Sequence, residues 1–215
     1  MFDSILASES VQEALSILQT EFPLAIWETF YVTVLSTLFA SIIGLPLGVL
    51  VTVGGKDGIL PLPKWLMAVL DRSVPFLILM IMVIPLTRFI VGTPVGTVAS
   101  IVPLTIAAFP FIARLVESSL REVSPNIIEA AQSMGASPLQ VIVKVLIPES
   151  VPSLVSNVTI AVTTILGYSA MSGVIGGGGL GQIAINYGYY RYQYATMVVA
   201  VILLIVLVQI FQSIG

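Results

Sequence analysis

The sequence predicts an all-α integral membrane protein with five transmembrane helices. Hydrophobic residues make up 57% of the 215 residues and charged residues only 9%, and the mean hydropathy is +1.08. In soluble domains about a quarter of the residues are charged, so this composition excludes a soluble domain. A helix needs roughly 20 apolar residues to cross a bilayer, and runs of that length recur along the chain. The expected spans are residues 28–53, 65–90, 94–117, 151–173 and 194–214.

The segment before the first span is predicted to form an amphipathic helix on the outer membrane surface. It lacks the basic region and the continuous apolar core of a secretory signal peptide. Apolar side chains recur there at roughly helical spacing beside acidic ones, as in helices that lie in the membrane interface. We therefore divide the chain into an outer-surface helix over residues 1–23 and a transmembrane domain over residues 24–215.

Helix-breaking residues interrupt the first two expected spans. Gly44, Pro46 and Gly48 lie in the first span, and Pro75 and Pro85 lie in the second. Inside a bilayer such residues are tolerated where neighbouring helices or water satisfy the backbone groups that they free. The pattern predicts a bundle with a packed interior, in which these positions are either ordinary kinks or hinges of a conformational change.

The basic residues predict the orientation of the chain. Most of the eight lie at the first and third connections between spans or at the helix ends beside them. Because positive charge concentrates on the cytoplasmic side, the connection 118–150 is predicted to be cytoplasmic and the N-terminus to lie outside. Five spans then place the C-terminus in the cytoplasm. The cytoplasmic group is Lys56, Lys64, Arg72, Arg114, Arg121 and Lys144, and the outer pair is Arg88 and Arg191.

The first half of the connection 118–150 contains signals for a short helix. Ser124 and Pro125 suit the N-cap and the first position of that helix, and Gly135 suits the left-handed residue that ends it. A compact polar element set between apolar spans indicates contact with something outside the membrane.

The second half of this connection predicts another helix. Ser137 and Gln140 have the spacing of a capping box, in which each residue satisfies a backbone N–H of the other. Pro148 is predicted to stop this helix, because proline removes a backbone donor. The two helices together form a rigid helix–turn–helix.

The residue types in the chain argue against catalysis. The sequence contains no cysteine and no histidine, which excludes disulfides, thiolate metal sites and the usual acid–base group near neutral pH. Asp71, Arg72, Arg114 and Glu117 lie near the cytoplasmic rim, where we expect them to pair or to reach the interface. Nothing in the sequence resembles a catalytic dyad, a triad or a metal cluster. We therefore expect a membrane protein that is not an enzyme and has no cofactor and no nucleic-acid partner.

The run Gly-Gly-Gly-Gly-Leu-Gly over residues 176–181 invites comparison with phosphate-binding loops. A dinucleotide fingerprint needs a preceding strand and a following helix, and a P-loop ends in Lys-Ser or Lys-Thr; this run has neither. A flexible outer loop or a re-entrant turn is a better interpretation than a nucleotide-binding site.

The connection 118–150 resembles the EAA loop of bacterial ABC-importer permeases, whose pattern is Glu-Ala-Ala, three residues, Gly, and an Ile-x-Leu-Pro ending. The residues on this pattern are Glu129, Ala130, Ala131, Gly135 and Pro148. Val145 and Ile147 replace the usual Ile and Leu. In that family the loop docks into a groove of a cytoplasmic ATPase subunit. The resemblance implies this coupling role for Glu129, Ala130, Ala131, Gly135, Ala136 and Pro138.

Further runs resemble the methionine-uptake branch of these permeases, and the resemblance extends over nearly everything after about residue 24. The matching runs are residues 72–76, 84–88, 110–114, 167–173, 178–182 and 187–189. The resemblance implies the type I importer permease fold in a bacterial plasma membrane. It also implies a homodimer, two cytoplasmic ATPase subunits that use the ATP, and an extracytoplasmic substrate-binding protein.

The fourth expected span supplies the candidate translocation path. It is rich in small residues, which let helices approach closely, and family geometry sets this helix beside the pore. Thr164, Tyr168, Met171 and Ile175 follow a helical spacing and share one face. A polarizable apolar stripe suits a thioether substrate, and ordinary packing is the alternative.

We therefore expect a permease subunit that moves L- or D-methionine, or a close analogue, into the cell by alternating access. Another amino acid or a methionine-containing dipeptide is the alternative substrate. An ion-coupled carrier or a channel is the alternative from a different class. Proteins of that class typically contain carboxylates near the bilayer midplane or inverted repeats, and we find neither in the sequence.

Overall fold

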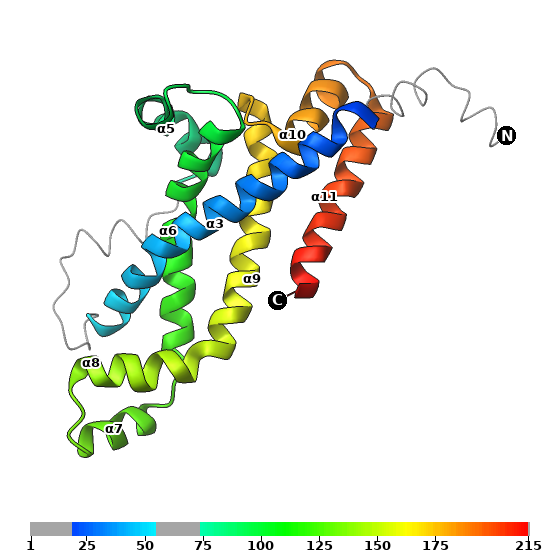
Figure 1. The fold of residues 1–215 in the computed structure, drawn as a ribbon. Helices are drawn as coiled ribbons and strands as arrows, with labels where there is room; N and C mark the ends of the chain where they lie inside the picture. Colours follow the sequence, from blue (N-terminus) through cyan, green and yellow to red (C-terminus); the bar gives the residue numbers. More distant parts are fainter. Residues whose placement is uncertain (1–18, 55–73, 215) are drawn as a thin grey trace.

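The computed structural model describes residues 19–54 and 74–214, and every element within these ranges is helical (Figure 1). Elements η1 and η3 are π-helical and η2 is a 3₁₀ turn. In chain order the elements are α3 (Phe22–Val53), α5 (Phe76–Val91), α6 (Thr97–Arg121), α7 (Pro125–Ser133), α8 (Pro138–Val141), η1 (Ile142–Leu146), α9 (Ile147–Ser172), η2 (Gly173–Ile175), α10 (Gly179–Ile183), η3 (Ala184–Tyr190) and α11 (Tyr194–Ile214).

Four helical stretches of the described chain are long and apolar enough to cross a membrane. They are α3, α6, the stretch Pro138–Ile175 and α11. Helix α5 is apolar but has only 16 residues. The earlier part of the second predicted span, with Asp71 and Arg72, lies outside the described residues, as do residues 1–18 of the predicted outer-surface helix. The structure is thus an all-helical membrane protein with four long apolar helices and a shorter one.

Helix α3 begins at Phe22, earlier than the predicted start of the first span at residue 28. Pro23 lies in the first turn, where its missing N–H would have no helical partner in any case. Glu28, the first residue of the predicted span, therefore lies inside the apolar helix rather than at its start. The polar contacts that make this possible come from distant parts of the chain and are described below.

Helices α3 and α6 pack closely against each other, and two glycines of α3 lie at the contact. A Cβ on Gly44 would lie 2.9 Å from the carbonyl oxygen of Phe109. A Cβ on Gly48 would lie 2.6 Å from the carbonyl oxygen of Ala113 and from Cβ of Val116. Small residues four apart allow membrane helices to pack backbone against backbone. The structural role of these glycines is therefore close packing, and α3 continues as a helix through Pro46.

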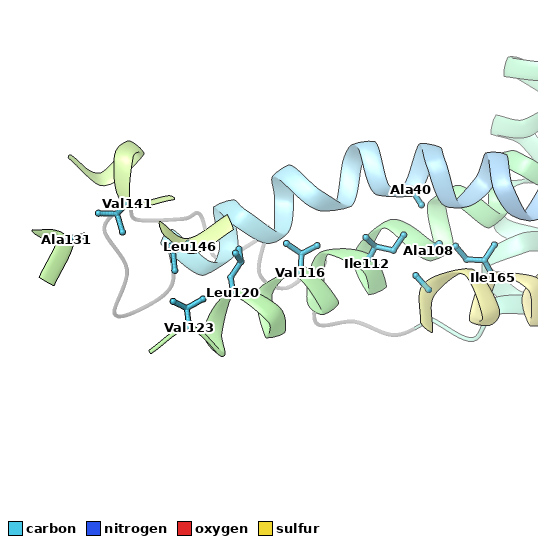
Figure 2. Close-up of a cluster of buried hydrophobic side chains, with 11 residues drawn as sticks. Ala40, Ala108, Ile112, Val116, Leu120, Val123, Ala131, Val141, Leu146 and Ile165 are labelled. Atoms are coloured by element: carbon cyan, nitrogen blue, oxygen red, sulfur yellow. The ribbon is translucent and has the colours of Figure 1, made fainter. Parts of the chain in front are cut away.

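A continuous row of buried apolar side chains connects the bundle with the α7–α8 segment (Figure 2). Within the bundle it includes Ala108, Ile112 and Val116, and at the far end it reaches Val141 and Ala131. Figure 1 shows α7 and α8 at one end of the molecule and α10 at the other. A single apolar core thus extends from the membrane helices into the segment outside them.

Candidate coupling and translocation sites

Helix α7 ends in the left-handed turn that the sequence predicts. Gly135 has a φ of +82°. Its N–H donates to the carbonyl oxygen of Gln132 at 2.9 Å, and the N–H of Ala136 donates to that of Ala131 at 3.1 Å. This pair of bonds is a Schellman motif, which satisfies the last carbonyls of a helix. Ser124 occupies the N-cap of α7 as predicted, but its side chain makes no capping bond.

The predicted capping box at the start of α8 is confirmed. The N–H of Gln140 donates to the Ser137 hydroxyl at 3.4 Å, and the N–H of Ser137 donates to the Gln140 side-chain oxygen at 2.8 Å. Only one residue, Ala136, therefore separates the left-handed Gly135 from the next cap. The turn between the two short helices is fixed by hydrogen bonds on both sides.

The prediction that Pro148 stops the second helix is wrong. Helix α8 passes through the π-helical turn η1 into α9, and Pro148 lies in the first turn of α9. A π-turn uses i→i+5 hydrogen bonds, so the ladder shifts just before the residue that lacks an N–H. The helical stretch Pro138–Ile175 therefore joins the extramembrane segment directly to a membrane span.

The six predicted coupling residues differ in burial: one is buried, one is half-buried and four are exposed. Ala131 is buried and belongs to the apolar row of Figure 2. Ala136 is half-buried and packs against the same row. The exposed residues are Glu129, Ala130, Gly135 and Pro138. One side of the segment is thus held on the bundle while the other faces outward.

Sequence reasoning missed two apolar residues on the outward side. Met134 is 83% exposed and Leu139 is 69% exposed, on either side of the turn. Exposed apolar side chains on a segment outside the membrane helices are typical of a protein interface. Their position next to Gly135 and Pro138, at the turn between the two predicted short helices, was the available signal.

Glu117 forms ion pairs near the C-terminal end of α6. The buried carboxylate accepts hydrogen bonds from Arg114 at 2.5 Å and from Arg121 at 2.9 Å. Nearby, the side-chain amide of Asn157 on α9 donates to the Ser119 hydroxyl at 2.7 Å. Of the two expectations for Arg114 and Glu117, pairing is confirmed. The contact between Asn157 and Ser119 also connects α9 to α6.

The four candidate path residues on α9 and η2 have different surroundings. Tyr168 stacks on Phe76 of α5 with ring centroids 4.6 Å apart, and Ile175 packs against the same apolar cluster. Met171 is 48% exposed. Thr164 is half-buried and donates its hydroxyl to the carbonyl oxygen of Ile160 at 2.8 Å. The structure therefore brings Tyr168 and Ile175 together, and Met171 lies apart from that cluster.

The glycine-rich run 176–181 forms a tightly packed turn. Gly176, Gly178 and Gly179 have φ values between +72° and +77°, which other residues rarely adopt. The hydroxyl of Ser100 on α6 donates to the carbonyl oxygen of Gly177 at 3.0 Å. Of the two interpretations of this run, the structure favours a re-entrant turn over a flexible loop.

The amides of this turn already have partners within the chain. The N–H of Gly178 donates to the side-chain oxygen of Gln182 at 2.7 Å, and that of Gly179 donates to the Glu28 carboxylate at 2.8 Å. The N–H of Leu180 donates to the Thr29 hydroxyl at 2.9 Å. A carboxylate thus occupies the position that a phosphate would take, which excludes nucleotide binding at these amides.

A second polar contact closes the start of α3 onto η3. The Tyr187 hydroxyl donates to the Glu21 carboxylate at 2.5 Å, and the Arg191 guanidinium lies 4.7 Å from the centre of the Tyr187 ring. The hydrogen bond to Glu21 raises the pKa of Tyr187 above its usual value of 10.0, and burial adds to the effect. The protonated phenol therefore holds this contact throughout the neutral pH range.

Comparison with known proteins identifies the family of the chain. The model of the "Binding-protein-dependent transport system inner membrane component" family matches residues 44–214. The "Probable D-methionine transport system permease protein MetI" of Vibrio cholerae is 54% identical over 196 residues, covering 89% of this chain and 87% of that protein. The "D-methionine transport system permease protein MetI" of Escherichia coli K12 is 48% identical over 153 residues, covering 69% and 70%.

Solved structures give the same assignment. A chain from "Inward facing conformations of the MetNI methionine ABC transporter", CY5 native crystal form, has a TM-score of 0.88 and 45% identity, covering 92% of this chain and 94% of that one. A chain of an amino acid ABC transporter with histidines has a TM-score of 0.70 and 19% identity, covering 95% and 94%, which shows likeness of fold alone. On this evidence the chain belongs to the family of binding-protein-dependent transport system inner membrane components and is similar to the MetI permeases.

Proposed function

We propose that the chain is the permease subunit of an ATP-driven importer that carries methionine, L or D, or a close analogue into the cell. The observation that carries the proposal is the segment from α7 to η1, which is fixed by local caps and continuous with α9. The substrate assignment is supported by the relatives that are named as D-methionine permeases.

The proposed assembly is a homodimer of five-span permeases in the bacterial inner membrane, with two ATPase subunits below and a substrate-binding protein above. In this proposal α5 is the described part of the fifth crossing. The distribution of basic residues supports a cytoplasmic α7–α8 segment and C-terminus, and an outer N-terminus. The relative that is described as the MetNI methionine ABC transporter supports the association with an ATPase.

Force would reach the membrane helices through continuous helix. ATP binding draws the ATPase subunits together and moves the coupling segment, whose exposed Glu129, Met134 and Leu139 form the docking side. Because Ala131 is packed into the core and η1 connects directly to α9, the segment and the helix would move together. The outer end of α9 would then open the path toward the binding protein.

The test of this function is purification of the chain with its ATPase subunit, followed by uptake in vesicles. We expect ATP-driven accumulation of methionine that requires the substrate-binding protein. Uptake of a different amino acid or of a dipeptide, with none of methionine, would replace the substrate. Uptake driven by an ion gradient without ATP would contradict the whole proposal and favour an ion-coupled carrier.

Met171 is expected to help form the proposed translocation path with Thr164, Tyr168 and Ile175. Its side chain is half exposed in the single chain, so a second permease copy or the substrate has access to it. Met171→Ala should raise basal leak or broaden uptake toward norleucine and leucine, while assembly stays normal. A lower melting temperature of the complex with unchanged selectivity would instead identify Met171 as a packing residue.

The proposed orientation can be tested by labelling because the native chain contains no cysteine. Asn126 on α7 and Tyr190 on η3 are both exposed, whereas Gly177 is buried and is unsuitable for a label. An impermeant thiol reagent on spheroplasts should label Tyr190→Cys and spare Asn126→Cys. Lysed cells provide the control, in which both positions should react. The reverse pattern in intact spheroplasts would invert the topology.

A further inference from the structure

Glu28 is a carboxylate inside the apolar helix α3, near the end of the molecule that holds α10 (Figure 1). One carboxylate oxygen accepts a hydrogen bond from the Thr97 hydroxyl at 2.9 Å, at the start of α6. The other accepts from the N–H of Gly179 at 2.8 Å, at the start of α10. Hydrogen bonds to a charged acceptor are roughly twice as strong as neutral ones. One side chain therefore joins three helices.

The next residue of α3 repeats the arrangement. The buried Thr29 hydroxyl accepts from the N–H of Leu180 at 2.9 Å and donates to the carbonyl oxygen of Ala25 at 2.9 Å. The N-cap of α10 is Gly178, which has no side chain to cap the helix. Since the first amides of a helix need acceptors, α3 supplies them from a distant part of the sequence.

The turn held by Glu28 packs directly on the outer end of α9. A Cβ on Gly181 would collide with the backbone carbonyl of Ala170, and a Cβ on Gly173 would collide with the backbone of Gly181. Ala170 is the neighbour of Met171, one of the proposed path residues. The position of the turn and the position of this end of α9 are thus set together.

On its other side the turn borders open space. Glu28, Gly178 and Gly179 line a cavity of about 330 Å³ that also includes Glu21 and Tyr187. The turn therefore has packing on the α9 side and room on the cavity side. On the cavity side its position depends on the hydrogen bonds from α3.

We propose that Glu28 is a positioning residue for transport: through the turn 176–181 it fixes the outer end of α9, without touching the substrate itself. The role of α9 in this statement rests on the proposed function. The hydrogen bonds that carry the inference do not depend on which substrate is transported.

The test uses a cysteine reporter within the turn region. Ser172 is 1% exposed, lies against Gly177, and is replaced by cysteine with little change in size. In the purified complex, Ser172→Cys should react slowly with N-ethylmaleimide. Adding Glu28→Ala removes both hydrogen bonds, and we expect the labelling rate to rise by about tenfold or more. The methionine preference over norleucine in vesicle uptake should fall in the same variant.

Two variants control for charge and for location. Glu28→Gln retains an acceptor for Gly179, and the Thr97 hydroxyl can turn to accept from the new amide, so its labelling rate should stay near that of the parent. Glu21→Gln changes a carboxylate that lines the same cavity but accepts from Tyr187 rather than from the turn. It should leave the rate unchanged. A second reporter, Ser119→Cys, lies buried at the cytoplasmic end of α6 and should remain protected in Glu28→Ala.

Several results would overturn the proposal. One is an unchanged labelling rate of Ser172→Cys when Glu28→Ala is added. Another is an equal rise in the labelling rates of Ser172→Cys and Ser119→Cys, which would indicate general loosening of the bundle. If Glu28→Ala fails to assemble, Thr29→Val decides the question. It removes the acceptor for Leu180, and the bond to Ala25 that it also removes lies within α3 and does not touch the turn. Faster labelling there supports the proposal and an unchanged rate refutes it. Protection in the parent without any methionine uptake would refute the proposed function and leave the positioning role intact.

Discussion

Replacing Gly135 with arginine is expected to lower ATP-driven uptake about tenfold or more, while the membrane helices remain folded. The residue has a φ of +82°, where a β-carbon costs about 1 kcal/mol. Apart from its chain neighbours, no atom of the described residues 19–54 and 74–214 lies within 4 Å of the position that this β-carbon would occupy. The chain itself therefore tolerates the side chain. A long cation beside Met134 and Leu139 would instead meet the proposed ATPase groove.

Gly135→Asn is the matched control for this substitution, because asparagine tolerates the left-handed conformation and is short. We expect it to retain ATPase association and most of the uptake. Fluorescence-detected sizing measures whether each permease is folded, and co-purification measures whether the ATPase is bound. Wild-type uptake by Gly135→Arg would refute the coupling role of the turn. Loss of the folded permease in both variants would show that the turn serves stability instead.

Gly48→Ala is expected to destabilise the bundle, by about 1–3 kcal/mol, as overpacked core substitutions do. The added methyl would lie 2.6 Å from the carbonyl oxygen of Ala113, which belongs to the α6 backbone and cannot turn aside. The two helices must therefore separate, which weakens the packing of Val116 and its neighbours. The melting temperature of the purified permease in detergent measures this effect.

Gly167→Ala supplies the comparison, since it adds the same methyl to another membrane helix. Gly167 lies in α9, and outside its own helical turn no atom in the part of the chain that the structure describes lies within 4 Å of the added carbon. Alanine also favours helix over glycine by roughly 0.5–1 kcal/mol, so stability should stay the same or rise. Equal losses of melting temperature in the two variants would contradict the explanation by close packing of α3 on α6.

Local hydrogen bonding explains which parts of the α7–α8 segment were predictable from sequence. Gly135, Ser137 and Gln140 form their contacts within a few residues of themselves, so their spacing in the sequence is nearly the whole of the geometry. Pro148 has the same kind of local signal and still misled the prediction. Its effect was absorbed by the π-turn η1, which widens the helix where the proline lacks a donor.

The membrane class and the approximate spans also follow from sequence, because a bilayer selects apolar runs of a fixed length. The start of α3 does not. Glu28 can lie inside that helix only because Thr97 and Gly179, which lie 69 and 151 residues away in the chain, donate hydrogen bonds to it. No local pattern records such partners, so the sequence placed Glu28 at the edge of the span rather than inside the helix.

The sequence by itself thus determined the class of protein, the caps of the coupling segment and the residues that resemble a known loop. Each of these depends on composition or on neighbours along the chain. Only the tertiary structure decided that Gly44 and Gly48 pack against α6, that Ala131 anchors the coupling segment, and that the glycine-rich run is a packed turn. Those facts depend on which backbone lies within van der Waals distance, and that is set when distant helices meet.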